Sequence, residues 1–221
     1  MTTLVLDNFI NQKYSAYFSR YYQDDLEILN ASNSEFPAEL DKYDHIILSG
    51  SEDSILNERD YIVKEMEVVR KAIKYQIPTL GICFGHQLIA RALLGIQGVR
   101  RAKIPEIGWK RVTFTEDTPL MNGIQKDFSI FNSHFDEVCN LTKDFTILAH
   151  SEMCEVQVFQ VKEAPVWGIQ FHPEIDVESA KKFIRDLKQI VPHMKEELDQ
   201  AILEAKDSRL PEDLFGNFYK L

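Results

Sequence analysis

The sequence has few cysteines and basic residues, and it has no long apolar run. Its three cysteines, Cys83, Cys139 and Cys154, have the spacing of neither a zinc site nor a disulfide framework, so reduced thiols are expected. No apolar stretch approaches the ~20 residues that span a bilayer, and no basic leader precedes the first strand-like run, Leu4 to Leu6. These absences predict a cytoplasmic protein that does not contact a membrane.

Basic residues are outnumbered by acidic ones, 25 against 35, which gives the 221-residue chain a formal net charge of −10 at pH 7. Such a charge opposes binding to the phosphate backbone of nucleic acids, so small molecules and other proteins are the expected partners. The histidines also lack the spacing of a metal site. No metal and no other cofactor are predicted.

Short apolar runs alternate with helical patterns in the first half of the chain. Buried strands are predicted at residues 4–6, 26–29, 46–48 and 78–82. Between the last two, residues 58–74 repeat apolar side chains at helical spacing. This alternation predicts a three-layer α/β/α fold with a mostly parallel central sheet.

The second half of the chain has more closely spaced strand patterns, which predict an antiparallel part of the sheet. They lie at residues 109–114, 128–131, 146–149, 156–161 and 166–171. Helical stripes follow at 180–190 and, beyond Pro192, at 194–205. We expect one domain over 1–191 and a helical extension, 192–221, packed on the same domain. The basic segment 100–103 is predicted to be a solvated loop.

The segment GICFGHQ, residues 81–87, has the pattern of a nucleophile elbow with cysteine in place of serine. A strand pattern precedes it and a helical pattern follows. Glycines flank Cys83 because side chains there would block the sharp turn and the approaching substrate. The N-terminus of the following helix favours a thiolate. Taken alone, the motif also fits a buried cysteine that only packs.

The segment GIQFHPE, residues 168–174, follows another strand pattern. In an extended backbone, residues two apart point to the same side, so His172 and Glu174 can face one site. A thiolate needs a base that removes its proton, and a carboxylate can fix the orientation of that base. Alternatively, His172 is a core histidine and Glu174 lies at a helix N-terminus.

Together, these two motifs resemble those of class I, triad-type glutamine amidotransferases, which hydrolyse glutamine to glutamate and ammonia. The resemblance extends from the first strand to about residue 191. It implies a flavodoxin-like α/β fold, with Cys83 as the nucleophile, His172 as the acid and base, and Glu174 as its orienting partner.

The segment ILSGSEDS, residues 47–54, is one substitution from the pyrophosphate loop of ATP pyrophosphatases. No other part of such a domain is present, however. In similar amidotransferases the loop after the third strand, usually S-G-G-P, supplies one backbone N–H of an oxyanion hole. The resemblance therefore implies an oxyanion hole formed at Gly50, Ser51 and Phe84, with Ser51 in the place of a glycine.

Glutamine binding is implied for Gln87 and for the backbone of Ser133, His134 and Phe135. Residues 133–138 resemble the S-H-x-D-x-V segment of the GMP synthetase amidotransferase subfamily, although a polar turn between two strands is the alternative. Asp7-Asn8-Phe9 resembles the opening of anthranilate synthase amidotransferases, but the following residues break that pattern. Residues 106–109, EIGW, resemble stand-alone homologues whose ammonia acceptor is unassigned.

The expected function is hydrolysis of glutamine through a cysteine thioester, with ammonia passed to a partner synthase subunit. One alternative is a stand-alone γ-glutamyl hydrolase or peptidase that uses the same triad. Another is a regulatory protein that kept the fold without the activity. The presence of all three triad residues weighs against the last alternative.

Overall fold

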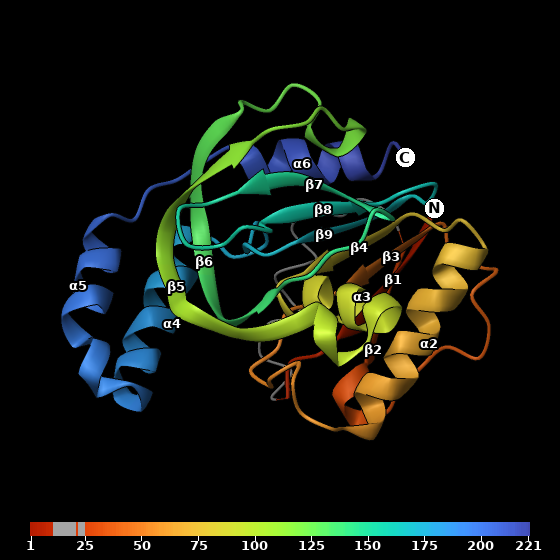
Figure 1. Cartoon of the computed structure of the whole chain (residues 1–221), viewed down its shortest axis with the longest axis horizontal. Coiled ribbons are helices and arrows are strands. Elements are labelled where there is room, and N and C mark those ends of the chain that lie inside the picture. Colours follow the sequence, from red (N-terminus) through yellow and green to blue (C-terminus); the bar gives the residue numbers. More distant parts are fainter. Residues whose placement is uncertain (11–20, 22–24) are drawn as a thin grey trace.

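The computed structural model describes residues 1–10, 21 and 25–221, which form one nine-stranded sheet with helices around it (Figure 1). The strands are β1 (Thr2–Asp7), β2 (Asp25–Asn30), β3 (His45–Leu48), β4 (Thr79–Ile82), β5 (Val99–Phe114), β6 (Asp127–Val138), β7 (Phe145–His150), β8 (Val158–Val161) and β9 (Val166–Ile169). The helices are α2 (Asp60–Lys74), α3 (Phe84–Leu94), α4 (Val177–Ile190), α5 (Lys195–Leu203) and α6 (Leu210–Phe218). Short 3-10 turns are η1 (Ala31–Asn33), η2 (Ile96–Gly98), η3 (Pro119–Met121) and η4 (Pro192–Met194).

The sheet has a parallel half and an antiparallel half. Its strand order is β2-β1-β3-β4-β9-β8-β7-β5-β6, and the pairs from β2 to β9 are parallel. The pairs from β9 to β6 are antiparallel, as the closely spaced strand patterns predicted. The α/β prediction is confirmed. Because the carboxyl ends of parallel strands share one edge, the segments that follow β3, β4 and β9 converge there.

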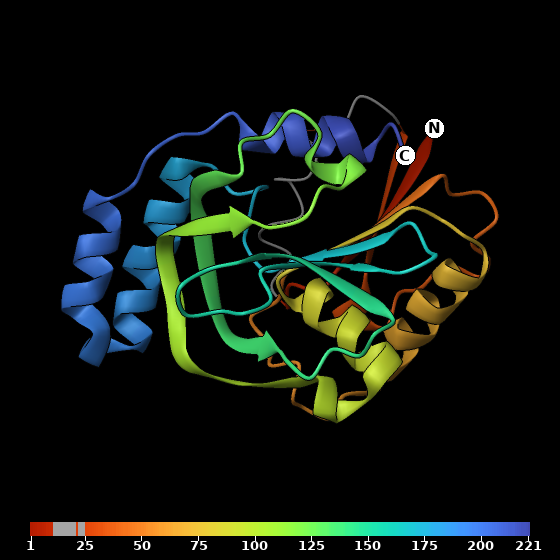
Figure 2. The same cartoon turned by 45° about the horizontal axis from the view of Figure 1, so that its top comes forward.

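Strand β1 illustrates how the sequence divides the core between the two faces of the sheet. Leu4 and Leu6 pack into the core under α2 and α3, whereas Val5 points to the opposite core, which α6 covers. Side chains of a strand alternate between faces, so an uninterrupted apolar run indicates burial on both. The long strands β5 and β6 curl away from the rest of the sheet, and α4 and α5 lie outside the curl (Figure 2).

Two predicted loops lie in strands instead. The basic segment 100–103 is part of β5, and residues 133–138 are part of β6 rather than a turn. Charge pairing across the two strands accounts for both differences. Arg100 Nε lies 2.7 Å from Glu137 Oε1, and Arg101 lies 3.0 Å from Asp136 Oδ1. Polar residues that look like a loop in sequence are here cross-strand partners.

The segment after residue 191 packs on the sheet at two places. Helix α5 contacts β5, where a Cβ on Gly108 would lie 2.5 Å from Ala201 Cβ, so the glycine permits this close approach. Helix α6, which the sequence patterns did not predict, buries Leu214, Phe215 and Phe218 in the core that contains Cys83. No helix among the described residues has both the length and the apolar composition to cross a membrane.

Candidate functional site

Cys83 lies in a sharp turn between β4 and α3. Its backbone has φ 50° and ψ −99°, and it is the N-cap of α3. Positive φ is strained for a residue with a side chain, so the surroundings must hold the turn in place. A Cβ on Gly85 would lie 2.2 Å from Leu48 O, and one on Gly81 would lie 2.5 Å from Gly85 O. The two glycines therefore let α3 sit directly on the sheet, as the elbow motif predicted.

His172 and Glu174 follow β9 and reach the same place. His172 Nδ1 lies 2.8 Å from Glu174 Oε1, and the His172 amide donates to Phe131 O at 2.9 Å. Both side chains are buried. With Nδ1 occupied by the carboxylate, Nε2 is the ring atom left for the Cys83 sulfur, with which His172 forms a hydrogen bond. The structure thus brings the three predicted triad residues together.

The electrostatics of this group favour a charged imidazole. Burial lowers the pKa of His172, but the negative charges of Glu174 and Cys83 and hydrogen bonds to both outweigh it and hold this pKa well above its ordinary value. The other two cysteines differ, because burial raises the pKa of both the Cys139 and the Cys154 thiols. Only Cys83 has a basic partner of this kind among the cysteines, all of which the structure describes.

The loop after β3 lies against the imidazole. A Cβ on Gly50 would lie 3.0 Å from His172 Cε1, so the loop could not approach this closely with a larger residue. The Ser49 hydroxyl donates to Gly50 O at 2.8 Å, which fixes the direction of the Gly50–Ser51 peptide. The Ser51 hydroxyl donates to Asn8 O at 2.8 Å and accepts from the Asp53 amide at 3.0 Å.

Phe84 lies beside this loop, and the hydrogen bond from the Gly85 amide to Ser49 O at 3.0 Å joins the elbow to it. Phe84 is the first residue of α3. The first amides of a helix have no intrahelical acceptor, so the Phe84 N–H is available to an oxyanion. Gly50, Ser51 and Phe84 thus lie close to the triad, as expected from the sequence.

The residues predicted to bind glutamine lie on α3 and β6. Cys83 Sγ contacts Ser133 O at 3.7 Å. Ser133 and Phe135 are partly exposed on one side of β6, whereas the His134 side chain is buried on the other. The Gln87 side-chain amide donates to Asp136 O at 2.7 Å and to Gln170 Oε1 at 3.2 Å. Both Gln87 N–H groups are therefore used within the protein, which leaves its oxygen for a ligand.

Two buried polar groups near the site had no local signal in the sequence. One lies under the Gly50 loop, where Asn8 Nδ2 donates to Glu65 Oε1 at 3.0 Å and to Ser49 O at 3.3 Å. Burial raises the pKa of Glu65 to about 8 despite the hydrogen bond from Asn8, and the charge of Asp7 adds to the rise. Glu65 belongs to the polar side of no motif, so sequence reasoning missed it.

The other group lies behind β6 and contains Glu106, His134, Ser151, Cys154 and Gln157. Possible ligand atoms of Glu106, His134 and Cys154 lie within 4.8 Å of one another. These residue types can bind a transition metal. The Glu106 carboxylate, however, already accepts hydrogen bonds from Ser151 and Gln157.

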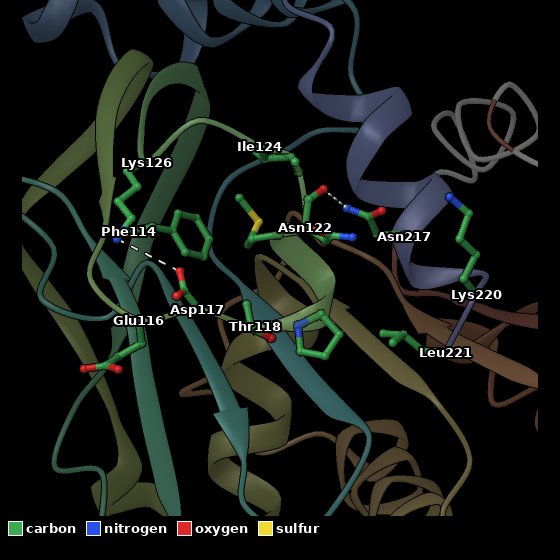
Figure 3. A pocket seen from close by; sticks show the side chains of 13 residues that line it. Phe114, Glu116, Asp117, Thr118, Asn122, Ile124, Lys126, Asn217, Lys220 and Leu221 are labelled. Atoms are coloured by element: carbon green, nitrogen blue, oxygen red, sulfur yellow. Dashed lines mark hydrogen bonds and ion pairs between the residues drawn. The ribbon is translucent and has the colours of Figure 1, made fainter.

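Two cavities lie apart from these residues. One of about 710 Å³ is bounded by the η3 region and the end of α6, where Asn217 donates to Asn122 O at 2.8 Å and Lys126 faces Asp117 (Figure 3). Another of about 630 Å³ is lined by Trp109 and Glu204 among others. None of the residues predicted for the triad, the oxyanion hole or glutamine binding lines either cavity.

Comparisons with known proteins agree with this geometry. The family model "Glutamine amidotransferase class-I" matches residues 2–189. The glutamine-hydrolyzing subunit of GMP synthase from Methanococcus aeolicus is 39% identical over 130 residues, which are 59% of this chain and 64% of that protein. The chain thus spans slightly less than two thirds of that relative. Gamma-glutamyl peptidase 3 of Arabidopsis thaliana is 33% identical over 184 residues, 77% of this chain and 73% of that protein.

A solved structure has the same fold. The glutamine amidotransferase of Thermotoga maritima superposes with a TM-score of 0.81 over 100% of this chain and 96% of that chain, at 21% sequence identity. The elbow cysteine, the His-Pro-Glu segment and the family match over most of the chain lead to one conclusion. The chain belongs to the class I glutamine amidotransferase family.

Proposed function

We propose that this protein hydrolyses the side-chain amide of glutamine to glutamate and ammonia through a thioester on Cys83. The observation that carries the proposal is the contact of the Cys83 sulfur with His172, whose other ring nitrogen lies 2.8 Å from Glu174. Nucleophile, base and orienting carboxylate are the three groups that such a reaction needs.

The reaction begins when His172 accepts the Cys83 thiol proton and the thiolate attacks the amide carbon. The resulting oxyanion is stabilised by the backbone N–H groups of the Gly50–Ser51 peptide and Phe84, which need no reorganisation. His172 then donates its proton to the departing ammonia, and a thioester remains. Water, deprotonated by His172, attacks the thioester carbon and releases glutamate and the free thiol.

Ammonia is the product that a second enzyme would use. The relatives named as a glutamine-hydrolyzing part of GMP synthase support a partner synthase that accepts ammonia from this chain. We propose glutamine as the substrate, the backbone of residues 133–135 and the Gln87 oxygen as its binding groups, and the cytoplasm as the location.

A variant of the nucleophile tests the proposal. We expect Cys83→Ala to abolish ammonia release from glutamine and to prevent covalent labelling by a glutamine-like electrophile. Cys139→Ala is the matched control, because Cys139 is also buried but has no basic partner comparable to His172. Labelling that persists in Cys83→Ala would contradict the assignment.

A second candidate function is hydrolysis of γ-glutamyl conjugates, and the similarity to gamma-glutamyl peptidase 3 over 77% of this chain favours it. The same triad would cleave a γ-glutamyl amide whose leaving group is an amine rather than ammonia. Parallel assays with glutamine and with γ-glutamyl dipeptides separate the two. Ammonia release alone supports the first function, whereas release of a free amino acid from the dipeptides supports the second.

A further inference from the structure

A second carboxylate–imidazole pair lies behind the strand that faces Cys83. Glu106 of β5 and His134 of β6 are directly opposite in the β5–β6 ladder, immediately after the register shift between Arg101 and Glu106. Both side chains are almost fully buried, at 2% exposure each. A buried carboxylate is costly unless its oxygens are hydrogen bonded, so such a pair requires an explanation.

The Glu106 carboxylate is held from three sides. Ser151 Oγ donates to Oε1 at 2.7 Å, and Gln157 Nε2 donates to Oε2 at 2.6 Å. His134 Nε2 lies 3.0 Å from the same Oε2. Ser151 and Gln157 are themselves buried, so this is a closed polar network within the core.

The hydrogen-bond partners of His134 show that its ring shares an additional proton with Glu106. Nδ1 lies 3.1 Å from Asp136 O, and a carbonyl oxygen can only accept, so Nδ1 carries a hydrogen. A neutral ring with its hydrogen on Nδ1 has a lone pair on Nε2. That lone pair would then face a carboxylate oxygen at 3.0 Å. A proton between Nε2 and Oε2 removes this repulsion and makes the contact a hydrogen bond.

The backbone that His134 fixes is the backbone that contacts the triad. Ser133 O meets Cys83 Sγ at 3.7 Å, and Phe131 O accepts from the His172 amide at 2.9 Å. Asp136 O accepts both from the His134 ring and from Gln87 of α3 at 2.7 Å. Movement of β6 would therefore change the surroundings of both Cys83 and His172.

We propose that Glu106 and His134 are positioning residues, whose shared proton holds β6 at the distance from Cys83 that glutamine binding and thiolate attack require. This inference rests on the proposed function and extends it to residues that do not contact the substrate. Displacement of a reacting geometry by about 1 Å can cost up to about a hundredfold in rate. The pair thus affects the reaction through the backbone of residues 131–136.

The test compares Glu106→Gln, His134→Gln and the double variant with the wild-type chain. Ser151→Ala is a milder variant that removes one hydrogen bond from the carboxylate. Glu137→Gln is the matched control, because Glu137 is a buried carboxylate on the same strand that pairs with Arg100 instead. The measurements are kcat and KM for glutamine, Tm, and the alkylation rate of Cys83 by iodoacetamide, followed by mass spectrometry of its peptide.

We expect each single variant to lower kcat/KM by about tenfold or more, with a higher KM and a changed rate of Cys83 alkylation. Because the two residues act through one proton, the double variant is expected to be no worse than the poorer single variant. Ser151→Ala is expected to change the same quantities less, and Glu137→Gln to stay within about twofold of wild type.

Three results would overturn the proposal. One is a lower Tm with unchanged KM and an unchanged Cys83 alkylation rate, which indicates a purely structural role. Another is additive effects in the double variant. The third is stoichiometric zinc that is lost from the Glu106→Gln and His134→Gln variants, since a metal ion would occupy the place of the shared proton.

The Cys83 alkylation rates also separate this proposal from the proposed function. If the wild-type chain hydrolyses neither glutamine nor γ-glutamyl dipeptides, the proposed function fails. The positioning of β6 is then still decided by whether the Glu106 and His134 variants change Cys83 alkylation and the Glu137 control does not.

Discussion

His172 is held at its position by one backbone and one side-chain contact. Its amide bonds to Phe131 O, and its ring bonds to Glu174, so the imidazole cannot turn away from Cys83 without breaking the contact with the carboxylate. These two contacts have different chemical consequences. The ring itself transfers protons in both half-reactions, whereas Glu174 only fixes and stabilises the ring.

We therefore expect His172→Ala to lower kcat by about a hundredfold or more, and Glu174→Gln to lower it by a smaller factor. Glutamine variants of a carboxylate keep its size, so the fold should be retained. Steady-state ammonia release from both variants, at equal concentrations of folded protein, checks the order. Equal rates for wild type and His172→Ala would show that His172 is not the base.

Glu65 gives a prediction on the pH dependence of stability. Its pKa of about 8 in the folded protein exceeds the ordinary glutamate value of 4.5, so between these values the folded state binds a proton that the unfolded state has released. Stability from this group is therefore lost as the pH rises from about 4.5 towards about 8. We expect Glu65→Gln to gain in Tm relative to wild type over this range.

The gain is expected to be on the order of a few kcal/mol above about pH 8, and it should vanish below about pH 5. Thermal unfolding of both proteins at several pH values measures it. Glu67→Gln on the same helix is the control, since Glu67 is largely exposed and should show no such trend. A constant difference in Tm across the whole range would contradict the prediction.

The contact of α3 with the sheet depends on Gly85. A Cβ there would lie 2.2 Å from the backbone oxygen of Leu48, which cannot move without disturbing β3. We expect Gly85→Ala to lower the free energy of unfolding by at least about 2 kcal/mol and to abolish activity, because the elbow and the Gly50 loop would separate. Denaturant unfolding and ammonia release are the measurements.

Gly216→Ala is the matched control for this substitution. Gly216 also lies in a helix, α6, but a Cβ there would meet nothing within 4 Å. Alanine is the better helix former by about 1 kcal/mol, so this variant should be as stable as wild type or slightly more stable. Similar losses of stability in both variants would show that close packing at Gly85 is not the cause.

The sequence predicted those elements whose signal is local. The apolar runs of β1, β3 and β4 and the elbow of Cys83 are read from adjacent residues, and so are His172 and Glu174. The extents of β5 and β6 were missed, because their polar ends are satisfied only across the pair. Glu106 meets Ser151 and Gln157 from 45 and 51 residues away. A single sequence gives no indication of such a contact, since hydrogen-bond partners are set by the tertiary fold.

At the scale of the whole molecule, we propose that residues 192–221 are part of the same folded unit as 1–191. Helix α6 buries four apolar side chains in the core beside the Cys83 strand: Leu210, Leu214, Phe215 and Phe218. Full burial of such side chains contributes about 1.5–3 kcal/mol each, and a domain has about 5–15 kcal/mol in total. We expect a chain that ends at residue 205 to unfold or aggregate.

Circular dichroism, Tm and soluble yield of the truncated chain check this expectation. The control ends at residue 219 and loses only Lys220 and Leu221, neither of which is buried. A chain ending at residue 205 that keeps the wild-type Tm and hydrolyses glutamine would show that α6 is separable. The helix would then be free to dock a partner instead.

The close seating of α3 on the sheet also determines how the chain tolerates random substitution. Gly81 and Gly168 are opposite each other on β4 and β9, and a Cβ on Gly168 would lie 2.5 Å from the His86 ring. With Gly85, they form a glycine seam that no other residue fits. In a saturation-mutagenesis screen for ammonia release, these three positions would be as intolerant as Cys83, although none of them takes part in the chemistry. Scored by activity alone, the seam would be mistaken for part of the active site.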